Sequence, residues 1–121
     1  MYESFKGEKM LLEIKDVTKV YGEHENKVKA LDRISLQFNE GEFVSVMGSS
    51  GSGKTTLLNC ISSIDKPTSG DILINGKSLI NLDSDQLAEY RAKNISFIFQ
   101  SYNLITNLTV YENIILPMQI Y

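Results

Sequence analysis

The chain has 121 residues, of which 42% are hydrophobic and 22% charged, a balance typical of a folded globular protein rather than a disordered or fibrous one. Twelve Lys and Arg residues against 15 Asp and Glu residues give a formal net charge of −3, which argues against nucleic-acid binding through a large basic surface. The single cysteine, Cys60, cannot form an intrachain disulfide, and this fits a reducing compartment.

The first elements expected in chain order are two strands. Residues 11–21 are rich in β-branched side chains, and residues 28–38 carry regularly placed apolar side chains, so we expect the two segments to pair as an antiparallel unit. Residues 43–47, FVSVM, predict a short apolar strand, and residues 56–63 have the apolar spacing of a helix. A glycine-rich loop lies between that strand and that helix.

The next segment predicts a hairpin and a helix. Residues 71–74 read as a strand, and the Asn-Gly pair at 75–76 favours a tight type I′ reversal after it. A helix is expected over residues 84–93, because Asp83 and Gln86 have the spacing of a capping box.

The last segment predicts one more strand and one more helix. Residues 95–99, ISFIF, are a continuous apolar run, which is typical of a strand buried on both faces. Thr109 and Glu112 form a second capping box, so a helix should start near Val110, with Pro117 ending or kinking it.

The glycine-rich loop matches the pattern G-x-x-x-x-G-K-[ST] at every fixed position. Glycines allow backbone N–H groups to converge on phosphate oxygens, and the N-terminus of the following helix adds a positive end. Lys54 supplies a charge for the outer phosphates, and the Thr55 hydroxyl can ligate Mg²⁺. A flexible Gly/Ser loop is the alternative. The loop residues are Gly48, Ser49, Ser50, Gly51, Ser52, Gly53, Lys54 and Thr55.

The sequence GSSGSGKTTLL, with VYG before it and KPTSGDILING and FIFQSYNLITNLTVYENI after it, resembles the nucleotide-binding subunit of ATP-binding cassette (ABC) transporters from Leu11 to Tyr121. The resemblance is closest to the bacterial branch that powers lipoprotein release, macrolide export and antimicrobial-peptide export or resistance. It implies an α/β fold, a P-loop NTPase core with an N-terminal antiparallel β subdomain. Residues 1–121 would be the N-terminal half of this domain, from the β subdomain and P-loop through the Q-loop to the start of the helical subdomain.

The resemblance also implies roles for residues outside the fixed motif. Tyr21 would stack on the adenine ring, and Thr56 would join the nucleotide-binding set; a tyrosine packed on the sheet at a strand end is the alternative for Tyr21. Gln100 would lie in the Q-loop, where its amide reaches Mg²⁺ or the attacking water, and a polar strand cap is the alternative. ATP and Mg²⁺ are the implied cofactors, with Thr55 and Gln100 at the metal.

The implied function is that of an ATP-binding subunit of a bacterial exporter, coupling hydrolysis to transport through a membrane permease. Such a subunit would form a homodimer with a second nucleotide-binding subunit. It would lie in the cytoplasm on the inner face of the cell membrane, without inserting into it and without a nucleic-acid partner. A soluble ABC-type ATPase acting on nucleic acid or ribosomes and a bare nucleotide-binding or regulatory module are the alternatives.

Hydrolysis in this family requires an apolar strand ending in Asp and Glu, an LSGGQ signature and a switch histidine, and the sequence contains none of them. We therefore expect the chain to bind ATP without turning it over, with no catalytic residue of its own. His24 is expected to be exposed and Cys60 to be a small buried side chain. Residues 103–118 would either receive a transporter's coupling helix or pack within the rest of the domain.

Overall fold

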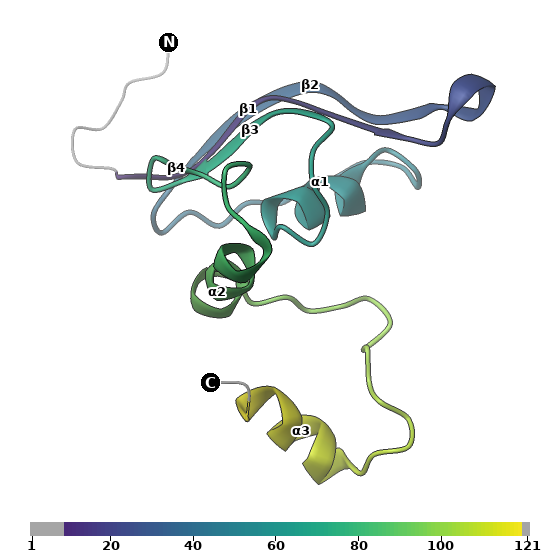
Figure 1. Cartoon of the computed structure of the whole chain (residues 1–121), viewed down its shortest axis with the longest axis vertical. Helices are drawn as coiled ribbons and strands as arrows, with labels where there is room; N and C mark the ends of the chain where they lie inside the picture. The colour runs from purple at the N-terminus through teal and green to yellow at the C-terminus, as the bar shows by residue number, and fades with distance from the viewer. Residues whose placement is uncertain (1–8, 120–121) are drawn as a thin grey trace.

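In the computed structural model, which describes residues 9–119, an antiparallel sheet is covered on one face by helix α1, with α2 beside it and α3 at the end of a long extended segment (Figure 1). A single 3-10 turn, His24–Asn26, joins the first two strands, and His24 is exposed as expected. The strands are β1 (Met10–Tyr21), β2 (Val28–Asn39), β3 (Ser69–Ile74) and β4 (Lys77–Ser78); the helices are α1 (Lys54–Ile61), α2 (Ser84–Asn94) and α3 (Val110–Met118).

The sheet has the strand order β2-β1-β3-β4, and every neighbouring pair is antiparallel. Ile14 on the central strand β1 lies opposite Leu36 on β2 and Ile72 on β3, which aligns apolar side chains across the sheet. The ladder is irregular after Ile14, where Asp16 and Arg33 both have positive φ. The predicted N-terminal antiparallel unit is confirmed.

Local turn and cap chemistry agrees with the sequence. Asn75 and Gly76 have φ values of 49° and 79°, as a type I′ turn requires, and they join β3 to β4. The capping box of α2 is present, with the Asp83 side chain accepting from the Gln86 N–H at 2.8 Å. The capping box of α3 is also present, and Pro117 lies in the last turn of that helix.

The core lies between the sheet and α1. Ile14, Val17 and Ile72 from the sheet are almost completely buried, and so is Cys60 from α1, which confirms its expected role as a small buried side chain. Tyr90 attaches α2 to this core, because its ring is buried and its hydroxyl donates to the Ile61 carbonyl at 3.0 Å. This packing fixes α1 against the sheet and thereby places the loop before α1.

Two predicted strands are wrong. Residues 43–47 and 95–99 form no strand within residues 9–119. Both segments expose large apolar side chains, with Phe43 100% and Ile98 96% exposed, so the burial expected for residues 95–99 is absent as well. A parallel strand exists only when a neighbouring strand accepts and donates its ladder hydrogen bonds. In the described part of the chain, these two segments have no such neighbour, although their apolar composition suits a strand inside a sheet.

Candidate functional site

The glycine-rich loop enters α1 through a left-handed backbone. Gly51 and Gly53 have φ values of 78° and 96°, and Gly53 is the N-cap residue of α1. A Cβ at Gly53 would lie 2.5 Å from the Ala30 carbonyl oxygen on β2, so a side chain there would collide with backbone. The start of α1 is therefore held close to the sheet, with the first helical N–H groups beside the loop.

Lys54, the first residue of α1, folds back across the loop. Its Nζ donates to the Gly48 carbonyl at 2.6 Å, to the Ser49 carbonyl at 2.7 Å and to Ser52 Oγ at 3.2 Å. A Cβ at Gly48 would come within 2.5 Å of Ser52 Oγ, so the loop is tight on this side as well. The ammonium group thus brings a positive charge among the loop carbonyls, close to the N-terminal end of the helix.

Thr55 and Thr56 follow in the first turn of α1 and face different surroundings. Thr55 is exposed beside the loop, whereas Thr56 is half-buried and close enough to Tyr21 to affect the pKa of its hydroxyl. Ser50 at the tip of the loop is exposed.

Gln100 is exposed on the segment after residues 95–99, and among residues 9–119 no hydrogen bond joins it to the loop. The structure therefore places Tyr21 beside Thr56 in the first turn of α1, whereas Gln100 shares no hydrogen bond with the loop in the described part of the chain.

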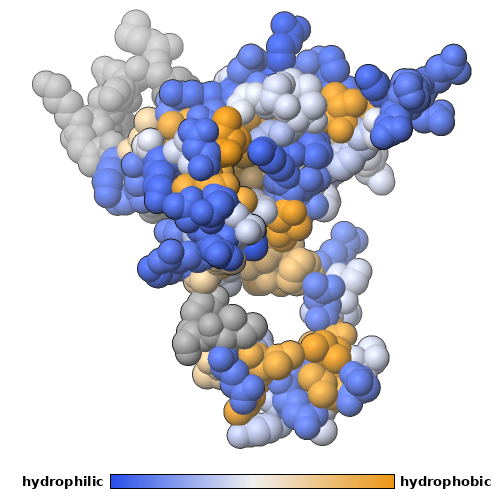
Figure 2. Space-filling model, viewed as in Figure 1, coloured by the Kyte–Doolittle hydropathy of each residue, from blue (hydrophilic) through white to orange (hydrophobic). Residues whose placement is uncertain are grey.

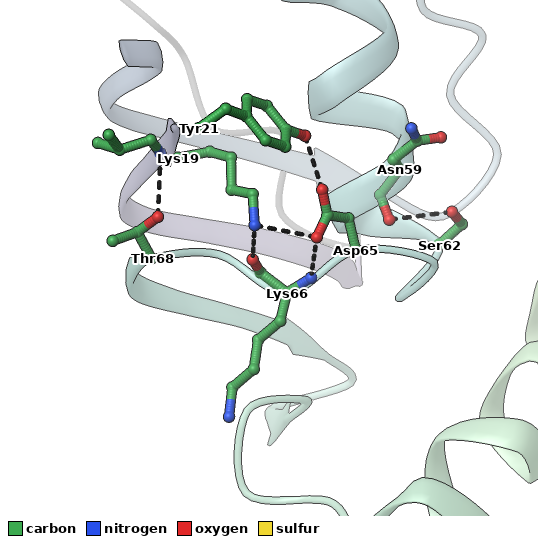
Figure 3. Close-up of polar contacts among 8 residues, drawn as sticks. Lys19, Tyr21, Asn59, Ser62, Asp65, Lys66 and Thr68 are labelled. Atoms are coloured by element: carbon green, nitrogen blue, oxygen red, sulfur yellow. Dashed lines mark hydrogen bonds and ion pairs between the residues drawn. The ribbon is translucent and has the colours of Figure 1, made fainter. Parts of the chain in front are cut away.

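Tyr21 ends β1 and is 39% exposed, and its hydroxyl donates to Asp65 Oδ2 at 2.6 Å (Figure 3). This hydrogen bond is the main reason that the pKa of Tyr21 is raised, and partial burial adds to it. The same bond lowers the pKa of Asp65, and the nearby Lys19 ammonium lowers it further. At neutral pH the pair is therefore a neutral phenol bound to an ionised carboxylate.

Lys19 completes this polar cluster beneath the Tyr21 ring, as Figure 3 shows. Its Nζ lies 2.9 Å from Asp65 Oδ1, donates to the Lys66 carbonyl at 2.7 Å and lies 5.0 Å from the centroid of the Tyr21 ring. Sequence reasoning missed Lys19 and Asp65. Lys19 could have been suspected because residues two apart on a strand share a face, but no sequence signal marks Asp65, which lies in the connection after α1.

Apolar side chains are exposed near the C-terminal end of the described chain. Figure 2 shows hydrophobic residues gathered on the part that contains α3, where Val110 is 79% exposed and Ile114 is 60% exposed. Helix α3 has no buried residue. Both expectations for this stretch, packing within a larger domain and docking of a partner helix, are compatible with such a surface. None of the helices in residues 9–119 has the length and apolar content to traverse a lipid bilayer.

Comparison with known proteins gives consistent matches. A family model described as ABC transporter matches residues 31–120. The bacitracin export ATP-binding protein BceA of Halalkalibacterium halodurans is 51% identical over 110 residues, which cover 91% of this chain and 44% of BceA. The macrolide export ATP-binding/permease protein MacB of Hyphomonas neptunium is 46% identical over 88% of this chain and 17% of its own length.

Solved structures of the cassette MJ0796, from Methanocaldococcus jannaschii, have the same fold. Its dimeric structure matches with a TM-score of 0.85 and 45% identity, covering 91% of this chain and 47% of the cassette. A second dimeric structure, in a post-hydrolysis state with ADP and Pi bound, matches with a TM-score of 0.84. The chain therefore spans about half the length of BceA and of this cassette.

Proposed function

The chain belongs to the ABC transporter family, and we propose that it forms the nucleotide-holding part of an ATP-binding domain. In this proposal residues 1–121 comprise the antiparallel β subdomain, the P-loop and the Q-loop, up to the start of the helical subdomain. The observation that carries the proposal is the Lys54 ammonium folded among the loop carbonyls at the N-terminus of α1. A cation, left-handed glycines and a helix N-terminus at one place suit a polyphosphate.

The loop residues fit a triphosphate chemically. Gly48 and Gly53 sit where a Cβ would collide with the loop or the sheet, so glycine at both positions allows the loop to keep its tight path around a ligand. Lys54 would exchange its carbonyl partners for the outer phosphate oxygens, which are stronger acceptors because they are charged. Ser49, Ser50, Gly51, Ser52 and Thr56 would contribute backbone or hydroxyl donors around the phosphates.

Mg²⁺ would be held through few protein ligands. The described residues contain no group of three or more His, Cys, Asp or Glu side chains able to hold a metal ion. The exposed Thr55 hydroxyl and the Gln100 amide are the protein oxygens that we assign to it, the rest coming from phosphates and water, as is usual for this cation. Mg²⁺ would neutralise part of the phosphate charge.

The whole protein would act as the ATP-binding subunit of a bacterial exporter. BceA and MacB are named for bacitracin and macrolide export, and MacB joins ATP-binding and permease functions in its name. We place the subunit in the cytoplasm, as a homodimer bound to a membrane permease on its inner face. Co-purification of the protein with a permease from its native membrane would support this, and recovery with ribosomes or nucleic acid instead would contradict it.

Nucleotide binding itself is tested by removing the Lys54 ammonium. Lys54→Ala should lower the affinity for both MgATP and magnesium tripolyphosphate at least roughly tenfold, because a charged hydrogen-bond donor to phosphate is lost. Lys66→Ala is the matched control, since it removes the same charge from an exposed side chain that points away from the polar cluster (Figure 3). Calorimetric titration that finds equal losses in both variants, or no ATP binding by the unmodified chain, would refute the proposal.

A further inference from the structure

Asp65, in the connection between α1 and β3, is bound on both of its carboxylate oxygens. Its Oδ2 accepts the Tyr21 hydroxyl at 2.6 Å, while its Oδ1 accepts from Lys19 Nζ at 2.9 Å and from the Lys66 N–H at 2.9 Å. Rotation of the carboxylate would break the two bonds at Oδ1. Lys19 and the Lys66 N–H therefore fix the position of Oδ2, which is the acceptor for the Tyr21 hydroxyl.

Two contacts with this cluster determine how the Tyr21 ring lies. The hydrogen bond to Asp65 holds the hydroxyl end, and the Lys19 ammonium approaches one face at 5.0 Å from the ring centroid. Strand β1 is bonded to the same connection, because the Val20 N–H donates to Thr68 Oγ1 at 2.9 Å. A half-exposed aromatic ring without such contacts would sample several rotamers, and ordering it on binding would cost affinity.

We propose that Asp65 is a positioning residue for the nucleobase, holding the Tyr21 ring in the orientation in which adenine stacks on the face opposite Lys19. This inference rests on the proposed function, in which Tyr21 contacts the base. In this inference Asp65 touches neither the base nor the phosphates. It affects base binding only through the orientation of the Tyr21 ring. Asp65 should therefore affect ligands that carry a base and spare ligands that consist of phosphates alone.

The test compares MgATP with magnesium tripolyphosphate in calorimetric titrations of the full chain. Asp65→Ala and Tyr21→Phe each break the same hydrogen bond, and Tyr21→Phe keeps the aromatic ring. Each should weaken ATP binding by roughly three- to tenfold and leave tripolyphosphate binding unchanged. The double variant should bind ATP no more weakly than Asp65→Ala, because the hydrogen bond to Asp65 that Tyr21→Phe removes is already absent from Asp65→Ala. Tyr21→Phe keeps the test available if Asp65→Ala does not fold.

Asp71→Ala is the matched control. The Asp71 carboxylate also accepts two hydrogen bonds, from Ser78 Oγ at 2.7 Å and from the Ile72 N–H at 2.8 Å, but it makes no contact with Tyr21. Its loss should reduce stability without changing the ratio of ATP affinity to tripolyphosphate affinity. An unchanged ratio in both Asp65→Ala and Tyr21→Phe, or an equal loss for both ligands, would overturn the inference.

Tyr21→Ala separates this inference from the proposed function. If it weakens ATP binding while Asp65→Ala and Tyr21→Phe do not, the stacking role stands and the positioning role of Asp65 is refuted. If Tyr21→Ala leaves ATP binding unchanged while Lys54→Ala abolishes it, phosphate binding stands, and both the stacking of Tyr21 and the role of Asp65 are refuted.

Discussion

At the scale of single residues, two glycines can be compared: Gly53, at the end of the loop, and Gly41, after β2. Both have a left-handed backbone, with φ values of 96° and 81°, so a side chain is strained at either position. They differ in their surroundings, because a Cβ at Gly53 would lie 2.5 Å from the Ala30 carbonyl oxygen, whereas nothing lies within 4 Å of one at Gly41. The pair therefore separates backbone strain from collision.

Gly41→Ala should cost about 1–2 kcal/mol of unfolding free energy, the usual penalty for an alanine in the left-handed region. Gly53→Ala should cost more, because the sheet and α1 must also move apart, and it should weaken nucleotide binding. Urea denaturation of both variants measures the difference. Equal costs would show that the loop accommodates the extra methyl group and that the close contact with Ala30 is not required.

The buried hydroxyl of Tyr90 should make the protein less stable at alkaline pH. Its burial raises the pKa of its hydroxyl from 10.0 to about 12. Because the raised pKa favours the neutral form in the folded state, the contribution of Tyr90 is complete below about pH 10 and is lost as the pH rises towards 12. Tyr90→Phe should flatten the fall in urea midpoint over that range. Tyr102→Phe, at an 83% exposed position, should leave it as steep as in the unmodified chain.

At the scale of elements, α2 and α3 have the same kind of N-terminal cap but differ in how they pack against the core. Both begin with a complete capping box, at Asp83 and Gln86 in α2 and at Thr109 and Glu112 in α3. Helix α2 is attached to the core through the buried Tyr90, and Arg91 Nη1 donates to the Ser63 carbonyl at 3.2 Å. Helix α3 has no buried residue. A cap contributes to global stability only where the helix is coupled to the core.

Asp83→Ala should therefore lower the unfolding free energy by about 1 kcal/mol, the usual value of an N-cap. Thr109→Ala removes an equivalent cap and should leave global unfolding unchanged, while amide hydrogen exchange in α3 becomes faster. Chemical denaturation and exchange measured on the same two variants provide the comparison. A similar global loss in Thr109→Ala would mean that α3 is coupled to the core.

An element could be predicted from the sequence where the contacts that form it join residues close together in the chain. The capping boxes and the Asn75-Gly76 turn depend on neighbours within a few residues, and sequence reasoning placed them correctly. Residues 43–47 and 95–99 have the composition of buried strands, but a strand also needs a partner, which local composition does not report. Asp65 was missed for the same reason, since its contact with Tyr21 spans 44 positions and arises from packing.

At the scale of the whole molecule, the described chain has one part with a buried core and another part with exposed apolar side chains. The sheet and α1 bury a common core, whereas residues 43–47 and 95–99 expose large apolar side chains that include Phe43, Met47 and Ile98. The loop lies at the boundary, directly after the first of these segments. The end of the loop at Gly53 is the N-cap of α1 and lies against Ala30 on β2, so the proposed phosphate site rests on the closely packed part of the fold.

In the proposed function, turnover would require groups that the sequence of residues 1–121 does not contain. Their sequence has no apolar strand ending in Asp and Glu to hold Mg²⁺ and polarise water, and no LSGGQ signature to close over the nucleotide. We expect the chain to bind MgATP without steady phosphate release. Coupled-enzyme phosphate assays at saturating ATP measure this, with Lys54→Ala as the background control. Steady release by the unmodified chain that Lys54→Ala abolishes would show that the 121 residues supply a general base of their own.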